Sequence, residues 1–121
     1  MNKKKKRKRA ASGGRSQPYY SLKTIFKCIK DGRVRLEPKV LHTAYRDFGW
    51  GTEKILDALK KLRRRHYYKT EPLRTNASTR IHVDYYRAKG LKGENVYTHF
   101  HIDDDHLVIG SFKEDKKNEV F

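Results

Sequence analysis

The sequence is poor in cysteine, with Cys28 alone among 121 residues, and it has no long apolar run. A single cysteine excludes an internal disulfide and favours a reducing compartment such as the cytoplasm. No segment approaches the roughly 18 consecutive apolar residues that span a bilayer. The charged N-terminus is not followed by an apolar stretch. We therefore expect neither a membrane partner nor a secretory signal peptide.

Acidic residues are also scarce, since 14 Asp and Glu stand against 30 Lys and Arg, which leaves a net charge of +16. Such a field attracts polyanions, and nucleic acid is the leading partner class. Residues 1–18 contain eight basic and no acidic side chains and are predicted to be a disordered tail. This tail could be a nucleic-acid arm or a nuclear-import signal. Residues 19–121 are expected to form one domain, which is still positive without the tail.

Three amphipathic segments with helical spacing begin the expected domain. Ser21 is a suitable N-cap for the first, which Gly32 ends. Pro38 suits the first turn of the second helix. Thr52 is expected to cap the third, which runs toward the basic stretch 60–65. Because each segment has only one apolar face, all three must cover another layer.

The apolar pattern becomes alternating after Arg65, which indicates β-strands. Four strands are predicted between turn-forming stretches: His66 to Arg74, Arg80 to Ala88, Asn95 to Asp103 and His106 to Lys113. Short connections favour hairpins. The expected fold is therefore α+β, an antiparallel sheet of about four strands packed on one face by about three N-terminal helices.

Alternation also predicts which side chains share the polar side of this sheet. They are Tyr67, Lys69 and Glu71 in the first strand, His82, Asp84 and Tyr86 in the second, and Tyr97, His99 and His101 in the third. Such a surface suits single-stranded RNA, because aromatic rings stack on unpaired bases and cations hold phosphates. Half-exposed sheets also carry Tyr and His for β-propensity alone, so the pattern by itself does not establish catalysis.

Two further patterns have alternative interpretations. His99-x-His101, followed by Asp103–Asp105 and His106, could bind zinc or manganese. Consecutive aspartates are more typical of a hairpin turn, so no metal is expected. Trp50, between two glycines, could stack on a base, but a loop anchor against the core is favoured.

Several short blocks keep the order and approximate spacing found in the MqsR family of toxins. These blocks are Tyr20–Lys23, Asp31–Arg35, His66–Lys69, Asp84–Arg87, Gly93–Tyr97 and Ser111–Glu114. Together they cover nearly everything from Tyr19 to about Lys117. The sequence therefore resembles this family, and the basic tail lies outside the resemblance.

The resemblance implies a type II toxin with a fold similar to the RelE and YoeB toxins. It implies an mRNA interferase that cleaves at short sequences without a metal or other cofactor, and a cognate antitoxin, MqsA-like or other. Lys69, Tyr97 and Lys113 match the family's important positions. A family glutamine directly before the aspartate of the second strand is replaced by Val83. His82 is the expected substitute, because alternation sends it to the polar side.

Metal-free RNA cleavage uses the adjacent 2′-hydroxyl as nucleophile, so the protein must neutralise the phosphate and manage two protons. We expect Lys69 and Lys113 to flank the scissile phosphate, with Tyr97 orienting it or donating a proton. His82 and His99 are candidate acid or base groups, because histidine titrates near neutral pH. RNA contacts are expected from six further side chains: Arg64, Arg65, Tyr67, Tyr86, Arg87 and His101.

Two non-catalytic functions are alternatives to an endoribonuclease. A basic nucleic-acid-binding module could use the same sheet without cutting RNA. A transcriptional or nuclear factor would instead depend on the N-terminal tail, but no convincing helix-turn-helix recognition helix is present.

Overall fold

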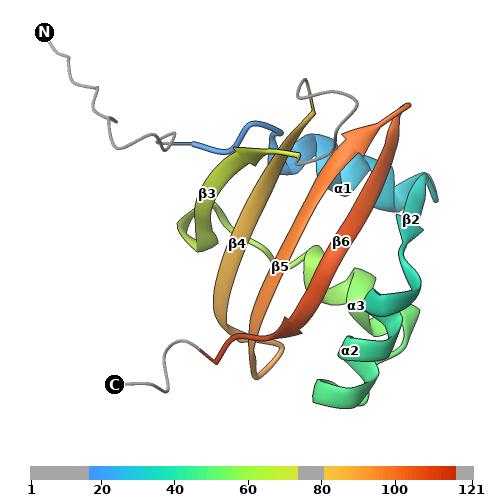
Figure 1. Cartoon of the computed structure of the whole chain (residues 1–121), viewed down its shortest axis with the longest axis vertical. Helices are drawn as coiled ribbons and strands as arrows, with labels where there is room; N and C mark the ends of the chain where they lie inside the picture. The colour runs from blue at the N-terminus through green and yellow to red at the C-terminus, as the bar shows by residue number, and fades with distance from the viewer. Residues whose placement is uncertain (1–16, 74–80, 117–121) are drawn as a thin grey trace, which may run out of the picture.

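The computed structural model describes residues 17–73 and 81–116 and has an α+β architecture (Figure 1). Nearly all of the predicted basic tail, residues 1–16, lies outside the described residues. The elements follow in the order α1 (Leu22–Lys30), β2 (Val34–Leu36), α2 (Pro38–Phe48), α3 (Thr52–Leu59), the 3-10 helix η2 (Arg64–His66), β3 (Tyr67–Pro72), β4 (His82–Leu91), β5 (Glu94–Asp103) and β6 (His106–Glu114).

The helices begin and end for local reasons. Ser21 caps α1 as predicted, because its hydroxyl accepts the Thr24 N–H at 3.1 Å. Gly49 ends α2 in the left-handed region with φ 74°, which costs a glycine little. The N-cap of α3 is Gly51 rather than the predicted Thr52, and the helix ends at Leu59, directly before the basic stretch. The basic stretch 60–65 consequently forms a turn and the start of η2.

The sheet is mixed and has five strands in the order β2-β6-β5-β4-β3. Strands β3 to β6 pair antiparallel as predicted, but β2 adds a parallel edge strand, with Val34 opposite Leu107. The expectation of four antiparallel strands was therefore wrong in the number of strands and in the direction of one of them. Strand β2 has only three residues, which is too short to show an alternation of apolar and polar side chains. Its extended conformation depends on pairing with β6.

All three helices lie on one face of the sheet, as Figure 1 shows, and the core fills the space between them. Its largest fully buried side chains come from both layers: Ile25, Val40, Ile55 and Leu59 from the helices, and Tyr86, Phe100, Ile109 and Phe112 from the strands. Trp50 is 7% exposed and packs near Phe112, so the favoured loop-anchor interpretation is confirmed. Across the described residues, none of the helices is long and apolar enough for a membrane span.

Candidate active site

The open face of the sheet carries two rows of side chains that run across neighbouring strands. The register pairs Arg87 with Tyr97 and Tyr97 with Lys113, which makes one row over β4, β5 and β6. The next row runs over four strands: Lys69, Tyr85, His99 and Ser111. Directly paired side chains lie within reach of one another. The open face therefore concentrates cations and aromatic rings in a small area.

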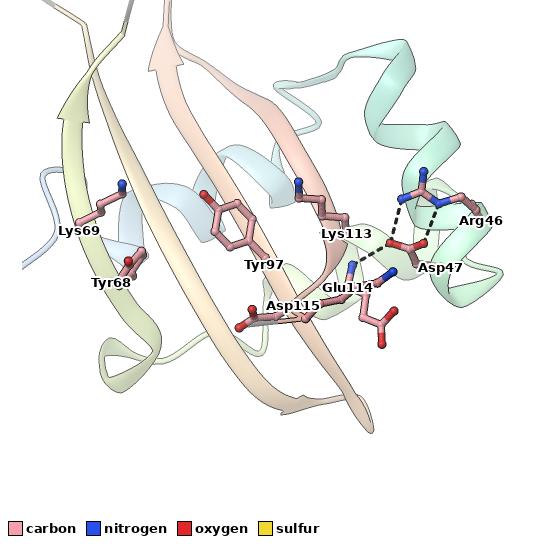
Figure 2. A pocket seen from close by; sticks show the side chains of 9 residues that line it. Arg46, Asp47, Tyr68, Lys69, Tyr97, Lys113, Glu114 and Asp115 are labelled. Atoms are coloured by element: carbon pink, nitrogen blue, oxygen red, sulfur yellow. Dashed lines mark hydrogen bonds and ion pairs between the residues drawn. The ribbon is translucent and has the colours of Figure 1, made fainter. Parts of the chain in front are cut away.

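Lys69, Tyr97 and Lys113 line one cavity of about 420 Å³ in this face. Figure 2 shows the three side chains next to one another, each from a different strand. The other lining residues are Arg46, Asp47, Tyr68, Glu114, Asp115 and Lys116. The structure thus brings together three residues that are distant in the sequence, as the sequence analysis expected; their chemical roles remain predictions.

A β-bulge gives this cavity an aromatic wall. Tyr67 pairs with Tyr86 and Lys69 pairs with Tyr85, so Tyr68 is an extra residue in β3. Tyr68 and Lys69 both line the cavity although they are consecutive. The Lys69 ammonium lies 5.5 Å from the Tyr68 ring centre. The aromatic wall therefore sits beside one of the two lysines.

The protonation states of the central residues follow from their neighbours. The Lys69 ammonium donates to Glu71 at 3.0 Å, and this hydrogen bond raises the pKa of Lys69. Burial raises the pKa of Tyr97, so its phenol keeps the proton at neutral pH. Lys113 lies over the Tyr97 ring and forms no ion pair with any carboxylate of the described part of the chain. The cavity therefore offers two ammonium groups and a neutral phenol.

Two carboxylates at the rim are already paired with arginines. Asp47 accepts from Arg46 at 2.8 Å and from the Glu114 N–H at 2.9 Å, as drawn in Figure 2. Asp115, 4% exposed, accepts from Arg87 at 2.9 Å. Because these arginines offset the charge of both carboxylates, an anion in the cavity meets less repulsion.

His99 lines an adjoining cavity of about 280 Å³, and its ring centre is 6.4 Å from that of Tyr97. Burial, followed in size by the charge of Lys39, lowers the pKa of His99 to about 4. At neutral pH the ring is uncharged and cannot serve as a general acid. His99 therefore borders the cluster of Lys69, Tyr97 and Lys113 without lining its cavity.

The family comparison adds a second line of evidence. A model of the family described as "Motility quorum-sensing regulator, toxin of MqsA" matches residues 17–114. The chain belongs to the MqsR toxin family. No curated protein sequence matches it significantly. MqsR family membership makes the chain a toxin of a toxin–antitoxin system and implies an antitoxin partner.

The prediction of which side chains of β4 lie on the open face of this MqsR toxin was wrong. Asp84 and Tyr86 are fully buried, and they lie on the helix side of β4 with His82. Asp84 accepts the N–H groups of Tyr19 and Tyr20 at 3.0 and 2.9 Å. The buried carboxylate thus anchors the chain segment that leads into α1, and a polar residue points inward because it has these partners.

His82 consequently cannot replace the family glutamine on the open face. Its ring stacks on Tyr19 with 4.2 Å between ring centres, and its carbonyl accepts from the Tyr20 hydroxyl at 2.6 Å. Val83 occupies the open side of β4 instead and lines the cavity of His99. Val83 therefore makes this part of the open face apolar.

The structure places the six residues that were expected to contact RNA in different parts of the domain. Tyr86 is fully buried, and Tyr67 packs against it in the core with 5.8 Å between ring centres, so the prediction that they line the open face was wrong. His101 lines the cavity of His99. Arg64 and Arg65 are exposed on η2. Arg65 and Arg87 line a further cavity of about 360 Å³ with His66 and Lys89.

Sequence reasoning missed Tyr68 and Tyr85, which both lie on the open face. Strict alternation assigned Tyr85 to the apolar side. The pair of consecutive tyrosines in each of β3 and β4 was the available signal, because it lets one ring point to each face.

The hairpin interpretation of the aspartate cluster is confirmed. Asp104 and Asp105 form the turn between β5 and β6 with φ 53° and 64°. His106 Nδ1 lies 2.9 Å from the Asp104 carbonyl. Within residues 17–73 and 81–116, no group of three or more His, Cys, Asp and Glu side chains is arranged to hold a metal ion.

Proposed function

We propose that this MqsR-family toxin is a sequence-selective endoribonuclease that cleaves single-stranded messenger RNA without a metal. The observation that carries the proposal is the cavity lined together by Lys69, Tyr97 and Lys113. The two cations can stabilise the charge on the phosphate, and the neutral phenol can donate a proton to the leaving oxygen.

The scissile phosphate lies between the two ammonium groups. Lys69 and Lys113 stabilise the charge that develops on the phosphate as the 2′-oxygen attacks. The same positive field lowers the pKa of the 2′-hydroxyl, so that its proton can pass to a solvent water molecule as the 2′-oxygen attacks. Tyr97 keeps its own proton because burial raises its pKa, so it can donate to the departing 5′-oxygen. The products carry a 2′,3′-cyclic phosphate and a 5′-hydroxyl.

The surroundings of the cavity suit an unpaired strand. Tyr68 and Tyr85 present rings on which bases can stack, and the cluster of Arg65 and Lys89 can hold backbone phosphates further along. We also propose a RelE and YoeB type fold, an MqsA-like antitoxin and action in the cytoplasm, where messenger RNA is translated.

The test is a cleavage assay on mixed-sequence single-stranded RNA in excess chelator. Full-length protein is compared with Lys69→Ala and Tyr97→Phe, and with Lys60→Ala as a control. Lys60 is an exposed lysine in a pair with Asp57, outside the cavity. We expect cuts at few sites, cyclic phosphate ends, and a rate lower by about 100- to 1,000-fold in the two cavity variants.

The competing function is a non-catalytic RNA-binding module. It is supported if the RNA stays intact while it binds tightly to the protein. Cleavage that survives both cavity substitutions unchanged would contradict the proposed site, because another set of residues would then perform the reaction.

A further inference from the structure

The cavity that contains His99 has features that catalysis at Lys69 and Lys113 does not use. Val83 is 2% exposed and gives it an apolar wall. Tyr85 and His99 give it two rings whose centres are 4.7 Å apart. His101, Lys39 and Glu37 also line it and supply its polar groups. A mainly apolar cavity with two adjoining rings in its lining and few polar groups suits a flat heteroaromatic ligand.

The floor of this cavity is shaped by Gly110. His99 pairs with Ser111 and Phe100 pairs with Ile109, so Gly110 is an extra residue in β6. A Cβ atom at this position would lie 2.8 Å from His99 Cε1, closer than van der Waals contact allows. The absence of a side chain at Gly110 therefore lets the His99 ring lie flat against the strand.

The second cavity adjoins the first one directly. Tyr85 borders the second and Tyr97 borders the first, and their ring centres are 6.2 Å apart. The Lys69 ammonium also lies 4.8 Å from the Tyr85 ring centre. A nucleotide held by its phosphate at Lys69 can therefore place an adjacent base in the second cavity.

We propose that this second cavity binds one unpaired nucleobase next to the cleaved bond and sets the sequence preference at that position. The proposal rests on the proposed RNA cleavage at the first cavity. Tyr85 and His99 offer adjoining rings to one side of the base, so that either ring can stack on it, and the uncharged His99 ring avoids burying a cation against it. Lys39 and Glu37 present a donor and an acceptor to its edge.

The experiment compares an intact single-stranded RNA with RNAs that carry an abasic nucleotide at each position flanking the cleaved bond in turn. For each full-length variant, kcat/KM on intact RNA is divided by kcat/KM on abasic RNA. At one position, we expect a ratio of roughly 10 to 100 for the unsubstituted protein, because stacking contributes about 1–3 kcal/mol per base. His99→Ala should bring that ratio close to one, whereas His99→Phe should keep it.

Gly110→Ala adds a purely steric test. Its methyl group displaces the His99 ring without changing the chemistry of any lining group, so the ratio should again fall. His106→Ala is the matched control, because His106 is the first residue of β6, next to the turn from β5, and does not line the cavity. A ratio near one at every position in the unsubstituted protein would overturn the proposal. A ratio that falls close to one in His99→Phe as well would also overturn it, because a stacking ring at this position would then not account for the preference.

The outcome is separable from that of the cleavage proposal. The same ratios are measured as Kd values with 2′-O-methyl RNA, which has no free 2′-hydroxyl to attack. If the protein cuts no RNA but still prefers the intact base by a ratio that His99→Ala removes, the cleavage proposal fails and the base site stands. If it cuts RNA with no such preference, the base site fails and the cleavage proposal stands.

Discussion

Lys113 stands directly opposite Tyr97 in the β5–β6 pairing, with its ammonium nitrogen 5.5 Å from the centre of the Tyr97 ring. The ring contact holds the exposed lysine side chain over the sheet. Lys69 approaches the same cavity from β3, two strands away from β5. A phosphate can therefore be held from two sides by groups attached to rigid strands.

Replacement of Lys113 by methionine should slow RNA cleavage by about 100-fold, because one cation that faces the phosphate is removed. Single-turnover rates at saturating protein measure the chemical step. Lys116→Met is the control, since Lys116 lines the same cavity but follows the end of β6. Equal loss in both variants would point to general electrostatic attraction instead of a positioned group.

Arg65 and Lys89 should contribute to RNA binding through the backbone. Their joint replacement by alanine should weaken binding and make the log–log salt dependence shallower by roughly 0.7 for each phosphate that the protein no longer neutralises. Fluorescence anisotropy with a labelled single strand between low and moderate salt measures the slope. Lys54→Ala, an exposed lysine on α3, serves as control. An unchanged slope would place the strand elsewhere on the surface.

Asp84→Ala should destabilise the fold by about 3 kcal/mol. The substitution leaves the N–H groups of Tyr19 and Tyr20 and the Thr70 hydroxyl without the acceptor that they now share. Urea unfolding followed by circular dichroism gives the free energy of unfolding. Asp57→Ala, at an exposed position on α3, should change it by less than about 0.5 kcal/mol. A similarly small effect for Asp84→Ala would mean that the hydrogen bonds to Asp84 contribute little to the stability of the fold.

His99 should make the stability depend on pH. Its pKa is about 4 in the folded chain against an ordinary value of 6.5, so the unfolded chain binds the proton more tightly. The stabilisation from the neutral ring is complete above pH 6.5 and is lost as the pH falls toward 4, by about 2–3 kcal/mol. Urea titrations of the unsubstituted protein and His99→Phe measure the difference. Parallel curves for the two proteins would contradict the lowered pKa.

The sequence predicted the helices and the four antiparallel strands because each has a one-sided pattern of its own. The third predicted strand is the clearest example, since Tyr97 and His99 lie on the open face and Val96 in the core, as alternation required. Strand β2 was not predicted because three residues hold no pattern, and its partner lies some seventy residues along the chain.

The second predicted strand was assigned the wrong face for a physical reason. Alternation ranks side chains by polarity, and it cannot show that the backbone of Tyr19 and Tyr20 will satisfy a buried Asp84. The inward position of Asp84 sets the positions of its neighbours, with Tyr86 in the core and Val83 on the open face. Family resemblance identified Lys69, Tyr97 and Lys113 without this knowledge, but it could not place His82.

The extra residue in β3 has a consequence for how this chain tolerates change. Tyr67 and Thr70 both point toward the core side, where their hydroxyls lie 2.6 Å apart, while Lys69 points to the open face. Excision of Tyr68 would restore plain alternation and keep all three on their present sides. The orientation of Lys69 toward the cavity therefore does not depend on Tyr68, and a single-residue deletion or insertion can remove or add this ring.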